Sequence, residues 1–142
     1  MVLFSKDRIL VPTDFSEASL AALKETIDFA EDKTDVHALY VLKPLEATEP
    51  GMIWDAIDTD QRRENVMKLF LENFPSETYA GLNFVIEEGD PSAEIIDYAE
   101  AQKIDLIVMP SRGRTGISRF FMGSIAERVV RLAHCPVLIV KA

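Results

Sequence analysis

Glycine and arginine residues gather in one short stretch of the chain, Pro110 to Ser124, in a pattern that suits the binding of an anion. An apolar run from Leu106 to Met109 precedes the stretch, and an amphipathic segment follows it. Glycines let backbone N–H groups approach an oxyanion closely, and the start of a helix adds unpaired donors and the positive end of a dipole. The stretch therefore predicts a cradle for phosphate or a similar anion.

The charge of this region stands out against the rest of the chain, which carries a formal net charge of -9. Positions 111 to 131 hold one acid, Glu127, and these arginines: Arg112, Arg114, Arg119, Arg128 and Arg131. An acidic surface repels nucleic acid and anionic membranes, whereas a confined basic segment suits a small, multiply charged ligand such as a nucleotide. A solvated face on which the arginines pair with nearby acids explains the same charges equally well.

Length and composition indicate one globular domain over residues 1–142. The chain is 48% hydrophobic and 27% charged, which is ordinary for a soluble protein. No apolar run approaches the roughly 18 residues of a membrane span, and the first residues do not resemble a secretory signal. Cys135 is the only cysteine. We therefore expect no internal disulfide and a reducing, cytoplasmic setting.

Short apolar runs alternate with helical patterns along the chain, as in a parallel sheet built from βαβ units. Ser16 is the expected N-cap of the first helix, the second helix is expected to start near Thr59, and Asp90 with Pro91 is a strong start signal for the third. Gly123-Ser124 opens the fourth. The predicted strands are Arg8–Pro12, Val36–Leu42, Leu82–Ile86, Asp105–Met109 and Pro136–Val140.

The stretch from Lys43 to Ile57 has no clean periodicity and contains Pro44, Pro50 and Gly51. We predict a loop there, and loops of this length are usually functional or mobile. Its apolar residues 52 to 54 fit a lid or a partner contact as well as they fit plain packing over the end of the sheet.

Ligands of open parallel sheets bind outside the carboxyl ends of the strands, where the strand order reverses. The residues that follow the predicted strands are therefore site candidates. They are Pro12, Thr13, Asp14, Val41, Leu42, Gly89, Asp90 and the stretch from Pro110 to Ser124.

Three pieces of the sequence resemble the universal stress protein family, and together they span essentially the whole chain. They are Ile9 to Ser16, the turn Gly89 to Pro91, and Gly113 followed after nine residues by Gly123-Ser124 and then by residues up to Val140. The resemblance implies a Rossmann-like α/β fold. Its open five-stranded parallel sheet has the expected order 3-2-1-4-5, with helices on both faces.

The resemblance also implies a site for ATP, with Mg²⁺ held by the phosphates. In nucleotide-binding members the residue matching Asp14 contacts the ribose and adenine region. Those matching Pro12, Val41 and Met109 line the adenine, and those matching Gly113, Gly123 and Ser124 hold the phosphates. The candidate binding residues are Pro12, Thr13, Asp14, Val41, Met109, Pro110, Arg112, Gly113, Gly123, Ser124 and Ile125.

The family pattern is Gly-x-x-Gly, nine residues, Gly-Ser/Thr, and this chain has Pro110 in place of the first glycine. Proline has no N–H and holds φ near about -65°. One lost hydrogen bond costs roughly 1 kcal/mol, against about 8 kcal/mol for a micromolar complex. We therefore expect weakened binding in preference to none, unless the proline also shifts the backbone.

The remaining reactive residues do not form a catalytic set. His37 and His134 are expected to pack, and no zinc pattern is present. Cys135 lies at the entry to the last strand, far from the expected ligand edge, and is not expected to be reactive. The sequence contains no P-loop and no nucleophile elbow. We expect no enzymatic activity, although weak ATP hydrolysis stays open.

The leading hypothesis is a stress-response or regulatory protein that binds ATP and acts through its conformation or assembly. A homodimer is expected through Val137 to Val140, because this short apolar terminal strand would otherwise be an exposed edge. The regulatory protein partner is unknown. The alternative is an interaction module of the same fold that has lost nucleotide binding through Pro110.

Overall fold

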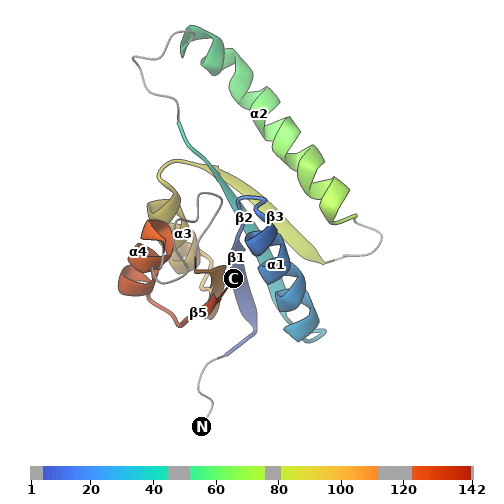
Figure 1. Ribbon diagram of the computed structural model, residues 1–142, viewed down its shortest axis with the longest axis vertical. Coiled ribbons are helices and arrows are strands. Elements are labelled where there is room, and N and C mark those ends of the chain that lie inside the picture. Colours follow the sequence, from blue (N-terminus) through green and yellow to red (C-terminus); the bar gives the residue numbers. More distant parts are fainter. Residues whose placement is uncertain (1–4, 45–51, 76–80, 112–122, 142) are drawn as a thin grey trace.

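The computed structural model describes residues 5–44, 52–75, 81–111 and 123–141, with the backbone alone for residues 52–58. Strands and helices alternate along this part of the chain, as the sequence predicts (Figure 1). The elements are β1 (Arg8–Pro12), α1 (Glu17–Phe29), β2 (Asp35–Leu42), α2 (Met52–Asn73), β3 (Leu82–Glu88), α3 (Pro91–Ala101), β4 (Leu106–Pro110), α4 (Ser124–Leu132) and β5 (Val137–Val140).

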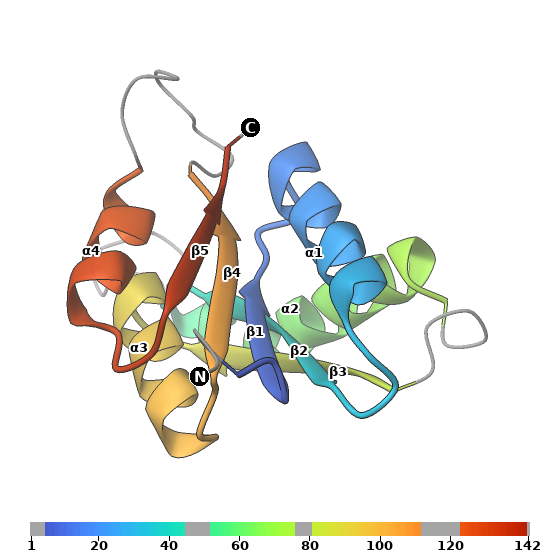
Figure 2. The same cartoon turned by 90° about the horizontal axis from the view of Figure 1, so that it is seen from below.

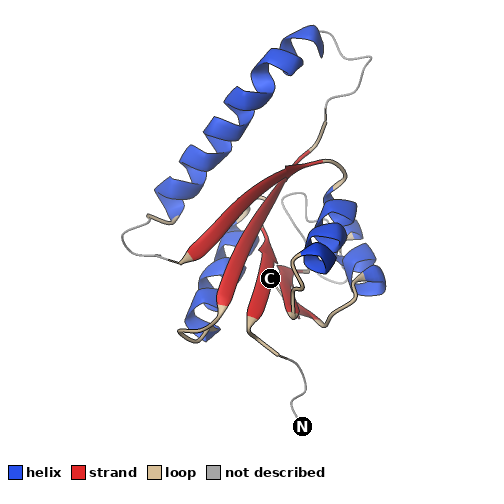
Figure 3. Cartoon of the chain, turned by 180° about the vertical axis from the view of Figure 1, so that it is seen from behind, coloured by secondary structure: helices blue, strands red, loops and turns tan. Residues whose placement is uncertain are grey.

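The five strands form one parallel sheet in the order β3-β2-β1-β4-β5, which confirms the predicted fold class and strand order. Helices lie on both faces of this sheet (Figure 3). Strand β1 is central, while β3 and β5 are the two edge strands of the described sheet. Because the order reverses beside β1, the carboxyl ends of β1, β2 and β4 flank the point at which such sheets bind ligands.

The core is divided by the sheet into two layers. Along β1, Ile9 and Val11 face the layer that contains α1 and α2, whereas Leu10 faces the layer that contains α3 and α4. All three side chains are fully buried. Figure 2 shows the two pairs of helices on opposite sides of the strands. A strand covered on both faces needs a continuous apolar run, which is the pattern the sequence shows here.

Two helix starts follow the sequence signals. The Ser16 hydroxyl accepts a hydrogen bond from the Ser19 N–H at 3.2 Å, and the Asp90 carboxylate accepts one from the Ala93 N–H at 3.0 Å. Pro91 stands in the first turn of α3. Both N-caps are therefore confirmed.

The predicted start of the second helix is wrong. α2 begins at Met52, so residues 52 to 57, expected in a loop, are helical. No glycine or proline interrupts the chain between Gly51 and Pro75. Extending an existing helix costs far less than starting one, so α2 continues back from Thr59 as far as the chain permits. The side chains of Met52, Ile53 and Trp54 lie outside the described residues.

Smaller differences concern the strand ends. Strands β2 to β5 begin or end one or two residues away from the predicted bounds, and β4 runs on to include Pro110. In the part of the chain that the structure describes, no helix is long and apolar enough to cross a bilayer.

Candidate functional site

A cavity of about 460 Å³ opens at the carboxyl edge of the sheet. The ends of β1, β2 and β4, the starts of α1, α3 and α4, and one residue of α2 line it. Nine of the eleven predicted binding residues lie around this cavity: Pro12, Thr13, Asp14, Val41, Met109, Pro110, Gly123, Ser124 and Ile125. The other two, Arg112 and Gly113, lie outside the described residues.

Side-chain hydrogen bonds fix the turn from β1 to α1 at the wall of the cavity. The Thr13 N–H donates to the Leu39 carbonyl at 2.8 Å, and the Thr13 and Ser19 hydroxyls are 3.2 Å apart. The Asp14 carboxylate accepts the Ser16 N–H at 2.9 Å. Asp14 thus stabilises the turn through its carboxylate, and it also lines the cavity.

The start of α4 faces the cavity without a side-chain cap. Gly123 is the N-cap residue and makes no side-chain hydrogen bond, while Ser124 is the first helical residue. The Ser124 hydroxyl therefore does not cap this helix, because Ser124 is already its first helical residue. The Gly123 N–H donates to the Ser111 carbonyl at 2.6 Å, so the next three amides, of Ser124, Ile125 and Ala126, are the donors without a partner inside the helix.

Pro110 does not break the pairing of β4 with β5. It stands opposite Val140 in the parallel register, and the following Ser111 N–H donates to the Val140 carbonyl at 3.0 Å. The buried proline ring lines the cavity at the end of a regular strand. Within the described strand, the proline thus leaves the register of β4 with β5 intact.

The end of β2 presents backbone groups to the same cavity. The Leu39 carbonyl bonds to Thr13 on the β1 side, and the Leu42 carbonyl accepts the Gly89 N–H at 2.9 Å on the β3 side. Successive residues of a strand direct their N–H and C=O to alternate neighbours, so those of Val41 point toward the β1 side. Pairing of β1 with β2 ends at Pro12 and Leu39 in the described chain. Val41 therefore lies beyond the ladder.

Two basic residues that line the cavity, Lys43 and Arg62, were not predicted from the sequence. The Arg62 guanidinium donates to the Lys43 carbonyl at 2.9 Å, which joins α2 to the end of β2. Among the described lining residues the charged ones are these two and Asp14. The cavity is thus locally basic in a chain of net charge -9.

One arginine of the basic segment, Arg128, forms an ion pair with an acid, Asp90. Arg128 of α4 donates to the Asp90 carboxylate at 3.3 Å and to the Ser92 hydroxyl at 3.1 Å. The Ala93 N–H, the Ser92 hydroxyl and the charge of Arg128 lower the pKa of Asp90. For Arg128, the interpretation as a paired surface residue is confirmed. The pair also joins the start of α3 to the middle of α4, and residues at the starts of both helices line the cavity.

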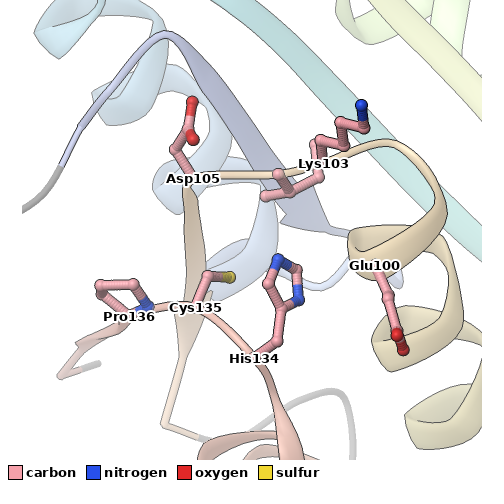
Figure 4. Close-up of a pocket in the computed structure, with 7 residues that line it drawn as sticks. Glu100, Lys103, Asp105, His134, Cys135 and Pro136 are labelled. Atoms are coloured by element: carbon pink, nitrogen blue, oxygen red, sulfur yellow. The ribbon is translucent and has the colours of Figure 1, made fainter.

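A second hollow, of about 450 Å³, lies at the opposite end of β4 and β5, and Figure 4 shows its lining. The side chains of His134 and Cys135 lie beside each other there, and the Lys103 ammonium extends away from them. Burial, with a smaller effect of Asp105, raises the pKa of the Cys135 thiol, so the neutral thiol is favoured. No cluster of three or more metal-binding side chains occurs among the described residues.

The two histidines behave differently. His37 is half-buried and its Nδ1 lies 2.7 Å from the Tyr98 hydroxyl, so it packs as predicted. His134 is exposed, and the expectation that it packs is wrong.

The parallel sheet in this order, with a cavity at its carboxyl edge, defines an open α/β protein of the Rossmann-like type. Residues 6–141 match the Universal stress protein family, and the chain belongs to that family. Universal stress protein MJ0531 of Methanocaldococcus jannaschii is 38% identical over 138 residues, covering 94% of this chain and 81% of the relative. The solved structure of MJ0577 from the same organism superposes with a TM-score of 0.79 at 30% identity, covering 96% of both chains.

Two solved structures of similar fold contain a nucleotide. One is a universal stress protein in complex with cAMP, with a TM-score of 0.70, 19% identity and coverage of 97% of this chain and 100% of that one. The other, from Arabidopsis thaliana, has AMP bound, with a TM-score of 0.63, 19% identity and coverage of 94% and 90%. At this identity the likeness concerns the fold alone.

Proposed function

We propose that the cavity binds an adenine nucleotide, with ATP as the leading ligand, and that the protein acts in a stress response as a nucleotide-dependent regulator. The observation that carries this proposal is the uncapped start of α4, which faces the cavity beside Asp14 and Pro110. A volume of about 460 Å³ is in the range of about 300–1,000 Å³ typical of small-molecule sites. The nucleotides in two neighbours of the same fold support the choice of ligand class.

In this proposal the phosphates lie at the start of α4. The N–H groups of Ser124 and Ile125 donate to phosphate oxygens, and the dipole of the helix favours their negative charge. In this proposal Mg²⁺ is held by the phosphate oxygens of the nucleotide.

The ribose and base occupy the rest of the cavity. Asp14 offers carboxylate oxygens to the ribose hydroxyls from the end of β1. The base lies between the apolar side chains of the wall, and the Val41 backbone offers one donor and one acceptor to its edge. The apolar lining residues include Pro12, Leu39, Val41, Ile95 and Met109.

Substituting proline at position 124 tests whether the backbone N–H at the start of α4 binds the ligand. Ser124 is the first helical residue, where proline is well tolerated, and Gly123 before it has φ -62° and ψ 156°, which is the conformation that proline requires of its predecessor. Ser124→Pro removes the N–H and the hydroxyl without breaking α4, whereas Ser124→Ala removes only the hydroxyl. We expect ATP affinity, measured by calorimetry with Mg²⁺, to fall about tenfold further in Ser124→Pro than in Ser124→Ala.

The alternative of an interaction module predicts a different result. Calorimetry would then show no heat with ATP, ADP or AMP for the unmodified chain. If Ser124→Pro and Ser124→Ala instead bind ATP with equal affinity, the nucleotide site exists but the phosphates do not lie at the start of α4. The proposal includes no catalytic step, and phosphate release from ATP above that of Ser124→Pro would contradict this part.

A further inference from the structure

Two adjacent arginines join α2 to the ends of two strands. The Arg62 guanidinium donates to the carbonyl of Lys43, just after β2, at 2.9 Å, and the Arg63 guanidinium donates to the carbonyl of Ile86 in β3 at 3.1 Å. The bonds are alike in type, in length and in their attachment to backbone. Only Arg62 lines the cavity at the edge of the sheet. The two residues therefore differ in their access to a bound ligand.

The other end of α2 is fixed by aromatic packing. The Phe70 ring stacks on Phe84 of β3 with centroids 4.0 Å apart and planes 5° apart, and Phe74 stacks on Phe70 at 5.2 Å. The rings of Phe70 in α2 and of Phe74 just after it are both buried. Arg62 and Arg63 lie about two helical turns nearer the start of the helix. From there α2 continues past the sheet (Figure 1).

The Arg62 side chain has donors left for a ligand. A guanidinium carries five N–H groups and no acceptor. Among the described residues its hydrogen-bond partner is the Lys43 carbonyl, and no carboxylate forms an ion pair with it. A cation that lines a cavity and retains N–H donors selects an acceptor, such as a phosphate or ribose oxygen or a ring nitrogen of a nucleotide.

We propose that Arg62 contacts the bound nucleotide through such an acceptor and that, by bridging the ligand and the Lys43 carbonyl, it makes the attachment of α2 dependent on occupancy of the cavity. This inference rests on the proposed function. Nucleotide binding then changes how firmly α2 is held, and this change reaches the surface of the molecule. Met67, Leu69 and Leu71 on this helix are each about 40% exposed or more, so a change in its attachment alters an apolar surface.

The test compares Arg62→Ala with the matched control Arg63→Ala in the full chain. Calorimetry measures affinity for ATP with Mg²⁺, and hydrogen exchange measures the protection of the α2 amides of residues 59–66 with and without ATP. In the unmodified chain and in Arg63→Ala we expect ATP to slow exchange in α2. In Arg62→Ala we expect affinity to fall about tenfold and, at saturating ATP, the slowing in α2 to disappear.

Each other outcome overturns the inference in a recognisable way. If Arg62→Ala binds ATP like the unmodified chain, or retains the slowing in α2, Arg62 does not link the ligand to the helix, while the nucleotide site stands. If the unmodified chain binds no nucleotide, the proposed function fails and the inference fails with it. Should Arg62→Ala not fold, Arg62→Lys keeps the cation but lacks the forked donors, and it must also lose the slowing in α2.

Discussion

At the residue scale, Phe15 shows how the wall of the cavity is held in place. Its φ of 61° is a left-handed conformation that costs a non-glycine residue on the order of 1 kcal/mol or more. The Phe15 ring packs on Tyr40, with centroids 5.4 Å apart, and its N–H donates to the Thr13 hydroxyl at 3.2 Å. These contacts offset the strain. As a result Asp14, the preceding residue, has a fixed position beside the cavity.

The candidate site residues divide into those that the sequence could predict and those that it could not. Asp14 and Val41 follow from a general property of parallel sheets, because the carboxyl ends of neighbouring strands meet at one edge. Arg62 follows from no local pattern. It reaches the cavity because α2 is attached to the residue after β2, and no local sequence pattern predicts where a helix lies relative to a strand.

Gly89, which follows β3, has a backbone conformation that other residues rarely adopt. Its φ is +151°, and a Cβ would lie 2.5 Å from Oε1 and 2.9 Å from Cγ of Glu94. Gly89→Ala should therefore combine backbone strain with displacement of the Glu94 side chain and lower the free energy of unfolding by about 2 kcal/mol. Urea unfolding measures this difference.

Gly81 provides the matched control for that substitution. Its φ is +93°, but a Cβ there would have no heavy atom within 4 Å. Gly81→Ala should cost strain alone, about 1 kcal/mol. If the two variants lose the same stability, the contact with Glu94 is not what constrains Gly89.

At the element scale, the helix starts show which local signals determine structure on their own. Ser16 and Asp90 each bond to an amide three residues ahead, so the information needed lies within one turn. The start of α2 lacked such a signal in the sequence, and extension of the helix back to Met52 could not be predicted from periodicity. Signals confined to one turn were therefore reliable, whereas the length of a helix was not.

The contact between β2 and α3 contains a group that makes stability depend on pH. His37 of β2 faces Tyr98 of α3, with its Nδ1 2.7 Å from the hydroxyl. Burial lowers the pKa of His37 below its ordinary value of 6.5, Asp35 opposes this effect, and Arg8 adds to it. The unfolded chain thus binds a proton at a higher pH than the folded chain does.

The sign of the pH effect follows from that difference. The contribution of His37 is fully present above the unfolded pKa of about 6.5, and it declines as pH falls from there toward the lower folded pKa. Urea unfolding between pH 8 and pH 5 should show the unmodified chain losing stability relative to His37→Gln over this range. His134→Gln, which removes the exposed histidine, is the control and should follow the unmodified chain. Parallel curves for all three proteins would contradict the prediction.

At the scale of the whole molecule, the strand order was predicted through the family resemblance and not through periodicity. Apolar runs identify strands, but they carry no information on which strands are neighbours. The observed order leaves β5 at an edge of the described sheet, as expected for a strand that pairs with a second subunit. The described contacts of α1 are with β1, β2 and β4. Leu138 of β5 is 46% exposed, so this edge strand has an apolar side chain at the surface.

The predicted homodimer through β5 is tested by placing a charge on this strand. Light scattering of the unmodified chain should give about twice the monomer mass of 15.9 kDa. Leu138→Asp buries a carboxylate without a partner if β5 pairs with a second copy. We expect a cost of about 3 kcal/mol, which raises the dissociation constant of the dimer by roughly a hundredfold.

Leu71→Asp is the matched control because Leu71 of α2 has the same 46% exposure as Leu138 and lies on a different element. A general effect of added negative charge would act on both variants, since each changes the net charge by the same amount. An effect on assembly should appear only in Leu138→Asp. If both variants dissociate alike, the dimer does not depend on β5, and if the unmodified chain is already a monomer at micromolar concentration, the edge strand is tolerated without a partner.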